Sequence, residues 1–126
     1  MKIYCGTDII EVERIKKAIL STPKFKEKIF TPAEISYAEN KGDVTKYQHY
    51  AGRFVAKEAI YKSISDIYAH VDLGQIEIIN DTENYNRPKV IIYNSEFNKL
   101  AQNMQIDVSI SHIKDYAIAY STASFL

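Results

Sequence analysis

The chain has 126 residues, 46% of them hydrophobic, and sixteen Lys and Arg residues balance sixteen Asp and Glu residues. This length suits one domain that buries a core without staples, and a net charge of zero argues against a general nucleic-acid binder. The one cysteine, Cys5, cannot form an intramolecular disulfide, and no stretch approaches the roughly 18 apolar residues of a membrane span. We therefore expect a single domain over residues 1–126, in the cytoplasm, without nucleic-acid or membrane partners.

The first half of the chain is predicted to be mainly helical. The segment Thr31-Pro32-Ala33-Glu34 is a capping box with proline at the first helical position, which is typical of a helix start. Before it, apolar residues at helical spacing predict an inner face of Ile15, Ala18 and Ile19. The predicted elements are a strand over 2–7 and helices over 11–20, from the capping box to about 40, and from beyond residue 43 to about 67.

The second half is predicted to be mainly strands. Residues 106–111 alternate apolar and polar side chains, the pattern of a strand buried on one face. Residues 81–87 are rich in Asn, Asp and Thr, which favours a turn. The predicted strands cover 73–80, 89–93, 106–111 and 116–121, and a short helix capped by Ser95 runs to Gln102. Helices followed by strands predict an α+β fold.

The segment from Gly52 to Lys62 is the most informative part of the sequence. Glu58 and Lys62 lie four residues apart, so both face the same side of a helix. The polar stripe also includes Ala51 and Val55, and the apolar stripe expected to face the core consists of Ala56, Ile60, Ile64 and Ile67. A Glu and Lys pair at this spacing is by itself an ordinary helix-stabilising pair of about 0.2 to 0.5 kcal/mol.

Two further segments give this pair a functional interpretation. A second carboxylate, Asp8, follows a predicted strand and the Gly6-Thr7 pair, and Ser111-His112 ends another predicted strand. These segments, with Phe30–Ile35 and the helix 51–62, occur in the same order in the holo-(acyl-carrier-protein) synthases, which the chain resembles. They are small 4'-phosphopantetheinyl transferases. The resemblance implies their fold, an antiparallel sheet packed against one long and several short helices.

The resemblance also implies the activity. The family moves 4'-phosphopantetheine from coenzyme A to a serine of apo acyl carrier protein, releasing adenosine 3',5'-bisphosphate, for fatty acid synthesis. Because charge builds on phosphate oxygens, a hard Mg²⁺ ion held by Asp8 and Glu58 is expected. Lys62 can reach a pyrophosphate oxygen as a point charge. Either Glu58 or a metal-bound water could accept the serine proton, and the sequence does not choose between them. We expect Asp8, Glu58 and Lys62 to be the catalytic residues.

Four other residues are expected to bind coenzyme A because of the resemblance. His112 and Ser111 would meet its adenosine or 3'-phosphate end. Arg53 and Lys57 point away from the Glu58 stripe, so geometry alone favours a surface or interface role, whereas the resemblance implies contact with the coenzyme phosphates. The other histidines, His49 and His70, match no motif and are expected to be solvated or locally hydrogen-bonded.

A basic run follows the first strand. From residue 14 to residue 28 there are six cations and one acid, Glu27. A solvated helix face is the simplest interpretation, and an acidic protein partner is the alternative. The resemblance implies that acyl carrier protein docks here, and Arg14 and Lys17 are the expected contacts. It also implies a homotrimer with active sites between subunits.

Two other functions remain open from sequence. A non-catalytic α+β interaction module would use the Glu58 and Lys62 pair only as a salt bridge and would bind neither Mg²⁺ nor coenzyme A. A broad-specificity phosphopantetheinyl transferase would use related chemistry on larger carrier domains, but that type fuses two copies of the unit, and this chain contains one.

Overall fold

A computed structural model describes residues 1–125. Its elements in chain order are β1 Lys2–Glu11, α1 Val12–Ser21, α2 Phe25–Ile29, α3 Pro32–Glu39, α4 Lys46–Ile64, a 3₁₀ turn at Leu73–Gln75, β2 Ile76–Asp81, β3 Arg87–Ile92, α5 Ser95–Leu100, β4 Met104–His112 and β5 Tyr116–Phe125. Two antiparallel sheets are present, one in the order β1-β5-β4 and one of β2 and β3. The predicted α+β fold, with an antiparallel sheet against one long helix, is confirmed.

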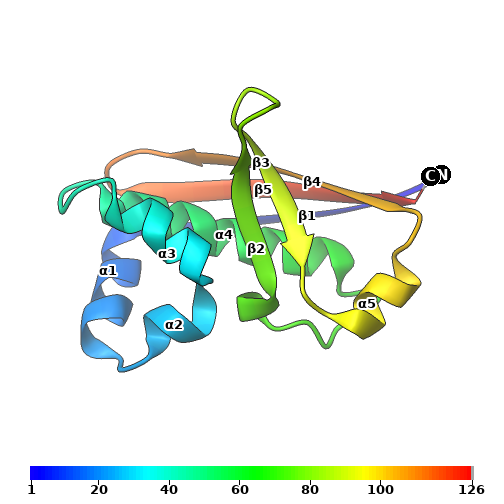
Figure 1. The fold of residues 1–126 in the computed structure, drawn as a ribbon, viewed down its shortest axis with the longest axis horizontal. Helices are drawn as coiled ribbons and strands as arrows, with labels where there is room; N and C mark the ends of the chain where they lie inside the picture. The colour runs from blue at the N-terminus through cyan, green and yellow to red at the C-terminus, as the bar shows by residue number, and fades with distance from the viewer. Residues whose placement is uncertain (126) are drawn as a thin grey trace.

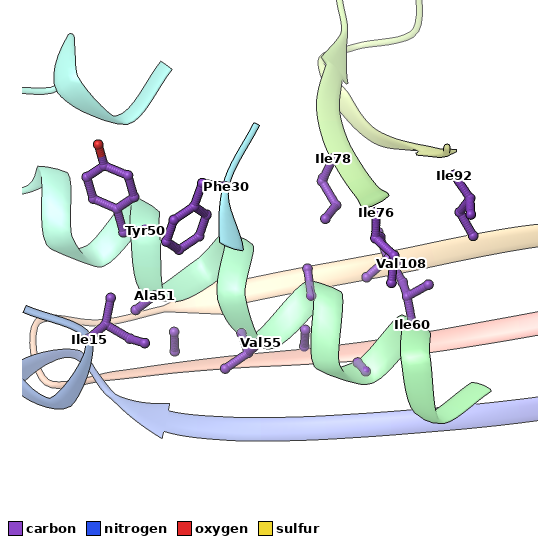
Figure 2. Close-up of a cluster of buried hydrophobic side chains, with 14 of the residues drawn as sticks. Ile15, Phe30, Tyr50, Ala51, Val55, Ile60, Ile76, Ile78, Ile92 and Val108 are labelled. Atoms are coloured by element: carbon purple, nitrogen blue, oxygen red, sulfur yellow. The ribbon is translucent and has the colours of Figure 1, made fainter. Parts of the chain in front are cut away.

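Helix α4 is the centre of the molecule. It lies along one face of the three-stranded sheet, while β2, α1 and α3 contact it from other sides (Figure 1). Figure 2 shows Ile60 of α4 close to Ile76 of β2 and Val108 of β4, all of them buried. The prediction that α4 has one apolar stripe was too narrow, because Ala51 and Val55 of the expected polar stripe are fully buried as well.

Small side chains let α4 lie close to the sheet. On the inner face of the central strand β5 the chain places Ala117, Ala119, Ser121 and Ala123, all of them buried. On the neighbouring strand β1, a Cβ atom added to Gly6 would stand 2.1 Å from the carbonyl oxygen of Ala59. Any other residue at position 6 would therefore push α4 away from β1.

The first strand is longer than predicted. β1 continues through Asp8 to Glu11, so Asp8 lies within the strand and opposite Ala119 of β5, where the sequence placed it after the strand. The Gly6-Thr7 pair is part of the ladder with β5, and the glycine is needed there for packing against α4.

Other boundaries differ at element ends. The capping box at Thr31 is confirmed, since the side chain of Glu34 accepts a hydrogen bond from the Thr31 backbone N–H at 2.9 Å. The cap of α5 is Asn94 instead of Ser95, because its side chain accepts from the Phe97 N–H. α4 begins and ends three residues inside the expected limits, β5 continues to Phe125, and the short helix α2 was not predicted.

Candidate active site

Three of the predicted site residues meet where α4 passes β1. Asp8 is on the face of β1 that looks toward α4, and the Lys62 Nζ atom lies 3.4 Å from an Asp8 carboxylate oxygen. The same ammonium donates a hydrogen bond to the backbone carbonyl of Thr7 at 2.9 Å. The close approach of α4 to β1 at Gly6 brings these groups together from positions more than fifty residues apart in sequence.

Glu58 shares this site electrostatically. It is half-buried, and burial together with the nearby Asp8 carboxylate raises the pKa of Glu58, while Lys62 acts in the opposite direction. Two carboxylates with one ammonium at the edge of the protein leave negative charge that a cation can offset. The side chain of Lys62 remains 52% exposed, so it can reach a ligand in solvent.

The two carboxylates fit a magnesium ion. Among residues 1–125 no group of three or more His, Cys, Asp or Glu side chains is arranged to hold a metal. Mg²⁺ does not need such a group when it binds together with a phosphorylated substrate, because one or two carboxylates suffice and phosphate and water complete its octahedron. Asp8 and Glu58 supply two carboxylates near a single ammonium, which is the chemistry of such a site.

Lys57 is paired with a buried carboxylate in the interior of the protein. It is completely buried, and its Nζ atom lies 2.7 Å from a carboxylate oxygen of Glu34, which is also buried. The ammonium also donates to the backbone carbonyls of Leu73, at 3.0 Å, and of Ile76. Burial lowers the pKa of Lys57, and the Glu34 carboxylate opposes this effect. The expected surface or interface role of Lys57 is wrong, because α3 and β2 cover that side of α4.

The surface role expected for Arg53 is also wrong. Arg53 is 7% exposed, and its Nη2 atom donates to the Asn80 side-chain oxygen at 3.0 Å. Its guanidinium lies 4.5 Å from the centre of the Tyr37 ring, a cation–π contact. The pKa of Arg53 is lowered because the residue is buried, and the nearby Tyr37 and Glu34 only partly oppose this effect. The Nε atom of Arg53 is buried without a hydrogen-bond partner among the described residues.

His112 and Ser111 lie on different faces of the sheet. Successive strand residues point to opposite sides, and the register pairs His112 with buried Ala117 but Ser111 with exposed Ile118. His112 is therefore on the α4 side, where its Nδ1 atom is 3.1 Å from the side-chain oxygen of Gln48. Since β1 and β4 are the two edges of the sheet, a single chain holds Asp8 and His112 at opposite edges.

Sequence reasoning missed the surroundings of His112. His49 packs edge-on against it, with ring centres 5.1 Å apart, and Tyr37 packs against His49 at 5.5 Å. The position of His49, three residues before Gly52 on the same helix, was the available signal, because Gly52 lies under β4.

Arg14 and Lys17 are exposed on α1. Their spacing of three residues puts them on one side of the helix. Of the six cations between residues 14 and 28, Lys26 alone forms an ion pair within residues 1–125, with Glu39 at 3.8 Å. The other charges are thus available to a partner.

The fold and the Asp8 site can be compared with known proteins. A family model described as the 4'-phosphopantetheinyl transferase superfamily matches residues 4–121. A holo-[acyl-carrier-protein] synthase of Ruminiclostridium cellulolyticum is 42% identical over 98% of this chain and 93% of its own length. The protein with the same description from Clostridium tetani is 40% identical over 96% and 94%.

Solved structures agree in fold. The ACPS-CoA complex of Chronobacterium ammoniagenes has a TM-score of 0.84 at 23% identity and covers 100% of this chain and 99% of its own. The Bacillus anthracis holo-(acyl-carrier-protein) synthase, solved with CoA (3',5'-ADP), has a TM-score of 0.71 at 29% identity, covering 95% and 94%.

The chain therefore belongs to the 4'-phosphopantetheinyl transferase superfamily. Within that superfamily its relatives are holo-[acyl-carrier-protein] synthases, over nearly the whole length of both chains, so the resemblance inferred from the sequence motifs is confirmed.

Proposed function

We propose that this protein is a holo-(acyl-carrier-protein) synthase, which transfers 4'-phosphopantetheine from coenzyme A to a serine of apo acyl carrier protein. The observation that supports it best is the meeting of Asp8, Glu58 and Lys62 in a chain that is 42% and 40% identical to two proteins described as holo-[acyl-carrier-protein] synthases. The products are holo acyl carrier protein and adenosine 3',5'-bisphosphate.

Each residue of the site has a role in this transfer. Asp8 and Glu58 would hold Mg²⁺, which when bound would offset the charge on the pyrophosphate oxygens. Lys62 directs its remaining N–H donors to a phosphate oxygen, because an ammonium has three donors and Thr7 and Asp8 occupy at most two. Either the Glu58 carboxylate or a water bound to the metal would accept the serine proton.

A homotrimer completes the site in this proposal. The sheet face away from α4 carries large apolar side chains that no element of residues 1–125 covers: Ile3, Ile9, Tyr116, Ile118 and Tyr120 are 63%, 62%, 47%, 45% and 51% exposed. One-sided sheets normally bury their apolar face, so the same faces of two further copies, arranged around a three-fold axis, are a fitting cover. Because Asp8 and His112 lie at opposite edges, the coenzyme would meet Asp8 of one subunit and His112 of the next.

Arg14 and Lys17 form the docking surface for the carrier protein in this proposal. Exposed cations without ion-pair partners raise the encounter rate with an acidic protein. Reversing both charges, in Arg14→Glu with Lys17→Glu, should raise KM for the carrier and weaken its salt dependence, with little change in the affinity for coenzyme A. An equal loss for both substrates would instead assign the helix to the coenzyme site.

We further propose that the reaction serves fatty acid synthesis in the cytoplasm. The free cysteine Cys5 fits a reducing compartment. None of the helices within residues 1–125 has the length and apolar character needed to cross a lipid bilayer.

One assay tests the main proposal. The protein is incubated with Mg²⁺, coenzyme A and apo acyl carrier protein, and the mass of the carrier is measured by mass spectrometry. A carrier heavier by one phosphopantetheine group, only when Mg²⁺ is present, is the expected result. An unchanged mass under all metal conditions would favour the interaction module. Modification of larger carrier domains at equal efficiency would favour the broad-specificity alternative.

A further inference from the structure

The His112 ring packs against the first part of α4. Its Nδ1 atom faces the Gln48 side-chain oxygen at 3.1 Å, and its Cδ2 atom is 3.7 Å from where a Cβ atom on Gly52 would stand. The ring of His49 packs edge-on against it, at a centre-to-centre distance of 5.1 Å and an interplanar angle of 71°. Two neighbouring residues of α4, Gln48 and His49, therefore contact a single imidazole from β4, and the missing side chain at Gly52 leaves room for its ring.

His49 is itself held from its other side. Its ring packs against Tyr37 of α3 at 5.5 Å and 85°. Tyr37 has the Arg53 guanidinium and the Lys41 ammonium each 4.5 Å from its ring centre. Arg53 in turn is anchored to Asn80 of β2. A continuous series of contacts thus runs from β2 through α3 and His49 to the exposed ring of His112.

Burial and nearby cations favour the uncharged form of His49. Burial lowers the pKa of His49, and His112, Lys41 and Arg53 lower it further because each places positive charge nearby. A neutral His49 acts on His112 through ring packing, without competing for an anion. This arrangement distinguishes the two histidines, since His112 is exposed and His49 is half-buried.

We propose that His49 is a positioning residue for His112. Gln48 accepts a hydrogen bond from Nδ1–H of His112, and the His49 ring fixes the plane of the imidazole, so that Nε2–H, when both ring nitrogens carry protons, is left to donate to an anionic oxygen of coenzyme A. This inference rests on the proposed function, in which His112 contacts the coenzyme. Positioning by a second aromatic ring reduces the rotamer freedom that His112 loses when a ligand binds.

Coenzyme A binding and transfer kinetics of four single variants and one double variant test this role. His49→Ala should raise Kd and KM for coenzyme A about five- to tenfold and change kcat less than twofold, because the reacting groups are untouched. His49→Phe keeps a ring of similar shape and should remain within about twofold of the parent. His70→Ala is the matched control, since His70 is an exposed histidine that packs on Tyr68. In a His112→Ala background, His49→Ala should add no further loss.

The inference and the proposed function fail in different ways. If the parent protein neither binds coenzyme A nor modifies the carrier, the proposed function is wrong. The His112 imidazole signals in NMR spectra of the free protein then still report the positioning, because His49→Ala should shift and broaden them and His49→Phe should preserve their width. Unchanged His112 signals in His49→Ala, or an undiminished effect of His49→Ala in the His112→Ala background, would overturn the positioning role.

Discussion

Two lysines of α4, five residues apart, differ in almost every physical respect. Lys57 is completely buried, and its three N–H donors have three protein acceptors, the Glu34 carboxylate and the carbonyls of Leu73 and Ile76. Lys62 is about half exposed, and its contacts are the Thr7 carbonyl and an Asp8 oxygen at 3.4 Å. An ammonium whose three donors all have protein acceptors has none left over for a ligand, whereas one with a free donor in solvent does.

The carboxylates beside the two lysines differ in the same way. Glu34 accepts hydrogen bonds from the backbone N–H groups of Thr31 and Ile78 as well as from Lys57, so its buried charge is fully compensated. Glu58 has a raised pKa because it is partly buried next to Asp8. The pair of Lys57 and Glu34 stabilises the packing of α3 and β2 on α4. Glu58 and Asp8 have the single ammonium of Lys62 beside them, and in the proposed function Mg²⁺ supplies further positive charge.

The largest expected effect is the loss of transfer activity when Asp8 or Glu58 loses its charge. Glu58→Gln and Asp8→Asn each remove one charged ligand and almost no volume, so transfer should fall by about a thousandfold or more, equivalent to about 4 kcal/mol of activation free energy. The melting temperature of both variants should stay at or above that of the parent. Full activity of either variant at limiting Mg²⁺ would refute the metal site. Glu83→Gln, in the exposed turn between β2 and β3, is the matched control.

The next largest effect is a loss of stability when Lys57, the buried partner of Glu34, is replaced. Lys57→Met keeps the length of the side chain but leaves the Glu34 carboxylate buried without its cation, which should lower the free energy of unfolding by about 3 to 5 kcal/mol. Urea denaturation measures this directly. The matched variant Lys62→Met removes an exposed pair and should change stability by less than about 1 kcal/mol. Similar stability losses in both variants would contradict the distinction between the two lysines.

The sequence predicted that Glu58 and Lys62 lie on the same side of α4, but it did not predict the buried pair of Lys57 and Glu34. Glu58 and Lys62 follow from helical spacing, and the capping box at Thr31 predicted the start of α3. The burial of Lys57 depends on α3 and β2 covering α4, and no local pattern reports which side of a helix such distant segments will cover. Helix α2 was missed because it begins after Lys24, which has φ of 65° although it is not a glycine.

The third effect is a smaller loss of activity when the exposed Lys62 is replaced. Lys62→Ala removes a donor for a phosphate oxygen, and transfer at low coenzyme A concentration should fall about tenfold or more, equivalent to about 1.4 kcal/mol. Its thermal stability should be close to that of the parent, because an exposed ion pair contributes little. A loss of stability with normal kinetics would support the alternative in which Lys62 forms only a structural salt bridge.

The smallest effect is a gain of stability at the site that loses activity. Burial and then Asp8 raise the pKa of Glu58 above its ordinary value of 4.5, so the folded state binds more protons at this group than the unfolded state. The contribution of Glu58 to stability therefore falls as pH rises through the interval between the ordinary and the raised pKa, and above that interval the group opposes folding by a constant amount. Glu58→Gln does not titrate, so in buffer with EDTA it should be more stable than the parent at pH 7, and the difference should shrink toward pH 4. Urea denaturation at several pH values measures it. A variant less stable than the parent at pH 7 would mean that Glu58, like Glu34, stabilises the fold, and the comparison between the two sites of α4 would no longer hold.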